Sequence, residues 1–118
     1  MADGRHRRAI LDAIASHNWD VVDECIADDI VRVAPYGDRY AGRDEYLAFI
    51  TDLMPKLAGY AMKLYRVTYP SDALAYVELS ETVELDGKRM RTPEVLVFEL
   101  GGDGRIARVE VYIQTPAG

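Results

Sequence analysis

The chain has one cysteine, Cys25, and two histidines among its 118 residues. A single cysteine excludes an internal disulfide and is typical of a reducing cytoplasm, which is where we expect the protein. Cys25 falls on an apolar helical stripe with Val22 and Ile26, so we interpret it as a core residue. His6 and His17 have no metal-ligand spacing to another His, Cys or acid, so no metal site is predicted.

Basic charge is also scarce, because 14 Lys and Arg residues stand against 20 Asp and Glu, for a net charge of -6. That balance argues against nucleic acid as a partner. The sequence contains no apolar run of about 18 residues and no signal-peptide pattern, so no membrane association is expected. It has no phosphate-binding glycine loop before a helix and no nucleophile elbow. We therefore expect no cofactor.

Helical periodicity occurs only in the N-terminal half. Helices are predicted at 5–16, 19–27 and 43–57, and Pro55 kinks the third or ends it earlier. A short strand is predicted at 30–34, and Tyr40-Ala41 forms a possible second one.

Four longer strands follow, at 60–69, 73–85, 88–100 and 105–114, and Asp86-Gly87 is a strong signal for a two-residue hairpin. Helices followed by an antiparallel meander predict an α+β fold in one domain, 1–118. We expect a cone-shaped roll in which three N-terminal helices pack on a curled, mainly antiparallel sheet. The open end of such a cone is a natural small-molecule pocket.

The most informative segment is the strand at 76–85, which alternates strictly between two faces. One face carries four apolar residues, and Glu81 lies in their middle. An unpaired buried carboxylate costs several kcal/mol or takes up a proton. Glu81 is therefore the first candidate for a catalytic group.

The hairpin register brings a second carboxylate to the same face. A two-residue turn at Asp86-Gly87 places Glu81 opposite Thr92 and Leu79 opposite Glu94. Two carboxylates in one apolar cone would couple, so that one proton leaves easily and the other late. That arrangement suits general acid/base catalysis by Glu81 and Glu94.

Two structural alternatives remain open. A bulge near Pro93 would shift the register by one residue and turn Glu94 outward. Glu81 could instead form a buried salt bridge with Arg66 or Arg91.

Other candidates for substrate binding come from the expected cavity wall and mouth. Tyr36 follows the first strand near the mouth, where its hydroxyl could donate to a ligand oxygen. The outer face of the sheet is more apolar and aromatic than a solvated face, with Tyr76, Val95, Val97 and Tyr112. This predicts contact between two copies, and hence a homodimer.

The chain resembles the nuclear transport factor 2-like superfamily, and within it the SnoaL-like branch, over essentially its whole length. The residues that carry the resemblance are Asn18-Trp-Asp, Ala27-Asp-Asp-Ile-Val31, Tyr40-Ala-Gly-Arg-Asp44, Asp103-Gly-Arg-Ile106 and Val109-Glu-Val-Tyr112. The resemblance implies a cone of three helices and a curled mixed sheet, commonly dimeric. Members include ketosteroid isomerases, epoxide hydrolases, polyketide cyclases, dehydratases and non-catalytic binding modules.

The usual catalytic groups of these families are missing. Where steroid isomerases carry a Tyr and two Asp residues, this chain has Ile10, Ala34 and Leu96. Where epoxide hydrolases carry an Arg and two Asp residues, it has Val77, Leu79 and Val111. The catalytic Asp of the cyclases also falls at Val111, and the dehydratase histidines have no equivalent.

The leading hypothesis is a small-molecule enzyme that performs cofactor-independent isomerisation, cyclisation or epoxide opening on an apolar polyketide- or terpene-like substrate. Glu81 would be the general base or acid, with Glu94 as its partner. The predicted substrate-binding residues are Tyr36, Phe49, Leu79, Thr92, Leu96, Phe98, Val109, Val111 and Ile113. The alternative is a non-catalytic module of the same fold that binds a hydrophobic ligand or mediates dimerisation.

Overall fold

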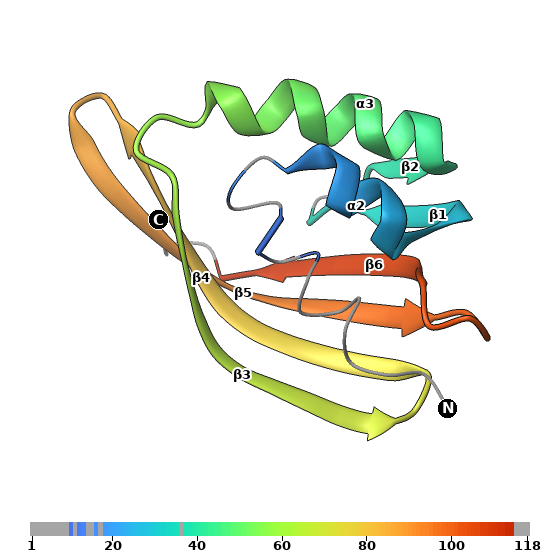
Figure 1. Cartoon of the computed structure of the whole chain (residues 1–118). Helices are drawn as coiled ribbons and strands as arrows, with labels where there is room; N and C mark the ends of the chain where they lie inside the picture. The colour runs from blue at the N-terminus through green and yellow to red at the C-terminus, as the bar shows by residue number, and fades with distance from the viewer. Residues whose placement is uncertain (1–9, 11, 14–15, 17, 36, 115–118) are drawn as a thin grey trace.

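The structure is a computed structural model that describes residues 10, 12–13, 16, 18–35 and 37–114. Two α-helices, a 3-10 helix and six strands follow one another along these residues (Figure 1). Their bounds are α2 Trp19–Cys25, β1 Ile26–Val33, β2 Arg39–Ala41, α3 Arg43–Leu53, η1 Met54–Lys56, β3 Ala61–Ser71, β4 Leu74–Leu85, β5 Lys88–Leu100 and β6 Ile106–Ile113.

The six strands form one sheet in the order β2-β1-β6-β5-β4-β3. All neighbours are antiparallel except β1 and β6, which run parallel. The long strands β3, β4 and β5 bend, and α2 and α3 lie on one side of the sheet (Figure 1). The predicted α+β fold with a curled, mainly antiparallel sheet is confirmed as a six-stranded mixed sheet.

The helices depart from the prediction in number and in length. The helix predicted at 5–16 lies largely outside the described residues, although Ile10, Asp12, Ala13 and Ser16 are helical. Two α-helices, rather than three, are therefore complete in the part of the chain that the structure covers.

The second predicted helix, 19–27, ends two residues early at Cys25. Ile26 instead pairs with Ile106 of β6 and is fully buried, so β1 begins there rather than at residue 30. The third, 43–57, ends at Leu53 and continues as the 3-10 turn η1, which contains Pro55. Proline has no N–H to donate and clashes with the preceding turn of an α-helix, which explains this end.

The β4–β5 hairpin has the register that the sequence predicts. Asp86 and Gly87 both have positive φ, 52° and 75°, as a two-residue hairpin turn requires. Glu81 lies opposite Thr92, and the ladder continues without a shift from Leu85 to Leu74. The alternative of a bulge at Pro93 in this hairpin is therefore wrong.

Gly87→Ala should lower the free energy of unfolding by about 1 kcal/mol, because a Cβ is strained at positive φ. No atom lies within 4 Å of the added Cβ, so the effect reports backbone strain alone. Gly102→Ala is the matched control, because its Cβ also meets no atom within 4 Å but its φ is not in the left-handed region. Urea unfolding of both variants checks this, and equal stabilities would contradict the strained turn.

The hydrophobic core lies between the helices and the concave face of the sheet. It includes Val22 and Cys25 of α2, which confirms the core position predicted for the cysteine. Other buried members are Ile26, Ile30, Tyr46, Ile50, Met54, Ala75, Val77, Leu79, Phe98, Leu100, Ile106, Val109 and Val111. No helix within the described ranges is long and apolar enough to cross a membrane.

Candidate functional site

A cavity of about 110 Å³ lies between the helical layer and the concave face of the sheet. Its walls come from β1, α3, η1 and strands β3 to β6. The lining residues are Ile10, Arg32, Tyr46, Ile50, Leu53, Met54, Leu57, Met62, Leu79, Glu81, Glu94, Leu96, Phe98, Val109 and Val111. Three charged side chains, Arg32, Glu81 and Glu94, are therefore set in an otherwise mainly apolar wall.

Glu81 is held by a tyrosine that precedes β3. The Tyr60 hydroxyl donates a short hydrogen bond to Glu81 Oε2. Burial, followed by the charge of Glu81 and this hydrogen bond, raises the pKa of the Tyr60 phenol far above its usual range. Tyr60 therefore keeps its proton and remains a donor to the carboxylate.

The predicted alternative of a salt bridge to Glu81 is wrong. Arg66 instead pairs with Glu78 through two hydrogen bonds. Arg91 donates to the Tyr65 hydroxyl at 2.7 Å. Both arginines are exposed, and their partners lie on the opposite face of the sheet from Glu81.

Glu94 has an environment that favours its neutral form. Burial, then the hydrogen bond and the negative charge of Glu81, raise the pKa of Glu94 from 4.5 to about 9, while Arg32 opposes the shift. One proton is therefore held on the carboxylate pair at neutral pH. A neutral acid beside a second carboxyl group is the pairing that acid/base catalysis uses.

Arg32 is the third charged group, and it comes from β1. Its Nη1 is buried and has no hydrogen-bond partner in the structure as described. The guanidinium carbon lies 4.7 Å from the ring centroid of Phe49, which in turn stacks on Tyr40 with 4.1 Å between centroids. The stack holds the guanidinium at the cavity wall, and both N–H groups of Nη1 lack a partner among the described residues.

The structure places most of the predicted site residues around this cavity. Glu81 and Glu94 line it together with Leu79, Leu96, Phe98, Val109 and Val111. Their placement in one cavity agrees with the sequence analysis, while their roles in substrate binding and catalysis stay predictions.

Three predicted substrate-binding residues are not among the described residues that line the cavity. Phe49 stacks between Tyr40 and Arg32 instead. Thr92 lies opposite Glu81 in the ladder but does not reach the wall. Ile113, at the end of β6, lines a groove beside Pro93 and Tyr112. Tyr36 lies outside the described residues.

Arg32 and Tyr60 are the polar residues that the sequence analysis missed. Arg32 is two residues from Ile30, which is fully buried, so alternation along β1 could have placed it on the inner face. Tyr60 is two residues from Met62, which pairs with Glu81. Predicting that Tyr60 lies near Glu81 would have required the register between β3 and β4, and no turn residue in the sequence predicts that register.

Tyr60→Phe should lower the free energy of unfolding by about 1–2 kcal/mol, because it removes a donor to a partly buried carboxylate. Thermal and urea unfolding measure the effect. Tyr76→Phe is the control, since Tyr76 is 39% exposed on the outer face of β4. Equal losses in the two variants would contradict a specific role for the Tyr60 hydroxyl.

A curled sheet that encloses an apolar cavity against a helical layer defines the nuclear transport factor 2-like fold. The chain belongs to the SnoaL-like domain family, whose sequence profile matches residues 7–109. No curated protein matches the sequence significantly.

Solved structures with this fold come from proteins with different named activities. An LEH-like epoxide hydrolase of M. tuberculosis has 24% identity and a TM-score of 0.79, covering 93% of this chain and 80% of its own. A protein of Kribbella flavida DSM 17836 named as a candidate ketosteroid isomerase has 21% identity and a TM-score of 0.82, with coverages of 97% and 78%. A protein of Jannaschia sp. CCS1 named as a candidate SnoaL-like polyketide cyclase has 16% identity and a TM-score of 0.78, with coverages of 96% and 88%. At these identities the likeness shows the fold alone.

Proposed function

We propose that this protein is an enzyme that moves protons within a small, mainly apolar molecule without a cofactor. The observation that carries the proposal is the placement of Glu81 and Glu94 together in one mainly apolar cavity, where burial favours a proton on the pair. Isomerisation is the reaction type that this pair supports best, because one group can accept a proton while the other donates one.

In this mechanism Glu81 is the general base. It removes a proton from a carbon of the substrate, and the electron pair of that C–H bond moves into the substrate's π system. Glu94 is the general acid and gives its proton to the atom at which negative charge develops. Tyr60 is a positioning residue, since its hydroxyl fixes one oxygen of Glu81.

The size of the cavity favours a small substrate. An apolar protein cavity of roughly 150 Å³ is large enough to hold benzene. The cavity of about 110 Å³ is on that scale, so it favours a ring of five or six atoms over a polyketide or terpene. A larger substrate would require Leu53, Met54 and Leu57 to move aside.

Deuterium uptake from D₂O tests this function without knowledge of the natural substrate. Cyclohexanone, incubated with the protein and followed by NMR, reports removal of a proton from carbon. We expect uptake faster than in buffer alone, at a rate proportional to protein concentration. Bound cyclohexanone without accelerated uptake would overturn the enzyme proposal.

A binding module is the second candidate, and a specific observation favours it. Ile10, Leu96 and Val111 line the cavity at positions where the resemblance places catalytic polar groups of related enzymes. Such a module would bind cyclohexanone, leave its deuterium content at the buffer rate, and keep its affinity after Glu81→Gln.

We also propose that two copies associate through the outer face of the sheet. Tyr65, Tyr76 and Tyr112 are 47%, 39% and 56% exposed there, and exposed patches of large side chains often mark interaction sites. Tyr112→Lys should weaken the association, because it places a charge in the contact. Sedimentation velocity over a range of concentrations measures this, and a monomeric wild-type protein would contradict the proposal.

A further inference from the structure

One charged group at the cavity wall, the Arg32 guanidinium, is left unused by the proton-transfer mechanism. Arg32 Nη1 is buried and has no hydrogen-bond partner among the described residues, although it belongs to a residue of the cavity wall. A buried N–H without a partner is unfavourable by an amount comparable to a lost hydrogen bond, and more for a charged group. Proteins usually satisfy such groups, so an orphaned one calls for an explanation.

Contacts with aromatic rings hold the Arg32 side chain in one position. Its guanidinium lies 4.7 Å from the Phe49 ring centroid, and Phe49 is itself fixed by stacking on Tyr40. A cation over an aromatic face is attracted to the ring's negative centre. The stack therefore holds the guanidinium at the cavity wall, where a ligand that enters the cavity meets it.

The charges around the cavity restrict what that ligand is. The charged lining groups are Arg32, Glu81 and Glu94. With one proton on the Glu81–Glu94 pair, the single remaining negative charge balances the positive charge of Arg32. A carboxylate ligand would add a second negative charge to a mainly apolar cavity, whereas a neutral ligand leaves the balance intact.

We propose that the Arg32 guanidinium is the anchor for the oxygen of a neutral carbonyl compound, so that the substrates are small cyclic ketones and enones. This inference rests on the proposed function for its chemistry, but its test is a binding test. The oxygen accepts from Arg32, and the hydrocarbon ring lies against Leu79, Phe98 and Val111. As the base removes a proton next to the carbonyl, negative charge develops on the oxygen that Arg32 already contacts.

The test compares three probes with the same six-membered ring on the wild-type protein by calorimetry and ligand-observed NMR. Cyclohexanone carries the carbonyl oxygen, methylenecyclohexane replaces it by a CH₂ group, and cyclohexanecarboxylate adds a negative charge. We expect the ketone to bind at least about tenfold more tightly than either of the others. Equal affinities, a preference for the carboxylate, or no binding by any probe would overturn the proposal.

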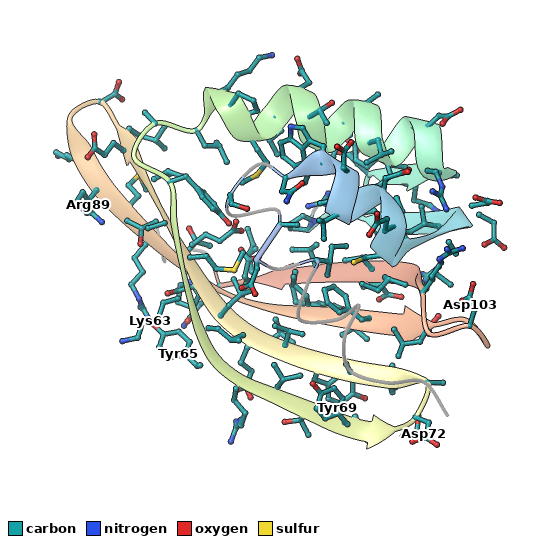
Figure 2. All side chains as sticks on the ribbon, viewed as in Figure 1. Lys63, Tyr65, Tyr69, Asp72, Arg89 and Asp103 are labelled. Carbon is teal, nitrogen blue, oxygen red and sulfur yellow. The ribbon has the colours of Figure 1, made fainter. Side chains whose placement is uncertain are left out.

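Arg32→Met tests the residue, because it keeps the length of the side chain but has no donor. The ketone should lose its advantage in affinity over methylenecyclohexane. In the wild-type protein, the hydrogen bond from Arg32 should move the ¹³C carbonyl resonance of the bound ketone downfield, and this shift should be lost in the variant. Arg89→Met is the control, since Arg89 is exposed on the β4–β5 hairpin away from the cavity (Figure 2). Retention of the preference or of the shift in Arg32→Met would overturn the assignment.

Arg32→Lys covers the case in which the Met variant does not fold, because it keeps the charge but not the planar fork. The Arg32→Lys variant should bind the ketone more weakly than wild type, but still more tightly than it binds methylenecyclohexane. Failure of this proposal and failure of the enzyme proposal are distinguishable. The first appears as loss of probe discrimination, and the second as normal ketone binding without deuterium uptake.

Discussion

Glu81→Gln should lower the rate of deuterium uptake into bound cyclohexanone by about 10²–10⁴-fold, which is the usual contribution of a general base. The amide has nearly the shape of the carboxylate but cannot accept a proton from carbon. It can still accept a hydrogen bond from Tyr60, so the wall of the cavity should be preserved. The measurement is the initial rate of uptake by NMR, with the ketone saturating so that binding does not contribute.

Glu84→Gln is the matched control for this prediction. Glu84 lies three residues further along β4, is exposed and is not part of the cavity wall. It should leave the uptake rate unchanged. If Glu81→Gln retained the wild-type rate while binding the ketone normally, Glu81 would not be the base.

The second large effect concerns the stability of the protein as a function of pH. The pKa of Glu94 is about 9 in the folded protein, against an ordinary value of 4.5, chiefly because the group is buried. Between these pH values the folded state binds more protons than the unfolded state. Stability therefore falls as the pH rises, by at most about 1.4 kcal/mol per pH unit from this group.

Glu94→Gln should remove this dependence, because an amide does not titrate. The variant should be more stable than wild type at pH 8–9, with the difference shrinking towards pH 5. Urea unfolding at pH 5, 7 and 9 measures it. Glu99→Gln, an exposed site on the same strand, is the control and should follow the wild-type curve.

Two other carboxylates act in a separate pH range. Hydrogen bonds from Arg66 to Glu78, and from Tyr112 and Arg108 to Glu110, lower the pKa of each carboxylate. Their contributions to the free energy of unfolding are present above the ordinary carboxyl pKa and are lost only as the pH falls below it. Their pH range does not overlap the range in which Glu94 affects stability.

Parallel stability curves for wild type and Glu94→Gln from pH 5 to 9 would contradict a buried neutral acid.

The carboxylate pair could be predicted because everything that positions it is local. Alternation along β4 places Glu81 on the inner face, and the Asp86-Gly87 turn fixes which residue of β5 lies beside it. The register of a hairpin is fixed when the turn type and the position of the apolar face both require the same pairing. The register at Glu94 therefore followed from the sequence.

The positions of Arg32 and Tyr60 at the site could not be predicted in the same way. Arg32 reaches the site through the parallel pairing of β1 with β6, which joins segments far apart in the chain and is irregular between Ile26 and Val31. Tyr60 depends on the pairing of β3 with β4, which also shifts between Leu64 and Arg66. Such irregularities depend on tertiary packing, which a short strand pattern does not reveal.

The parallel β1–β6 pair also has a consequence for the order in which the molecule assembles. The two carboxylates share a hairpin whose ends are close in sequence, and such local contacts form early and fast. Arg32 joins them only when the N-terminal segment docks beside β6, a contact that closes most of the chain into one loop. Until then the acidic pair has no cation from β1 beside it. The charge balance of the cavity therefore requires the long-range pairing of β1 with β6, whereas the carboxylate pair requires only the hairpin.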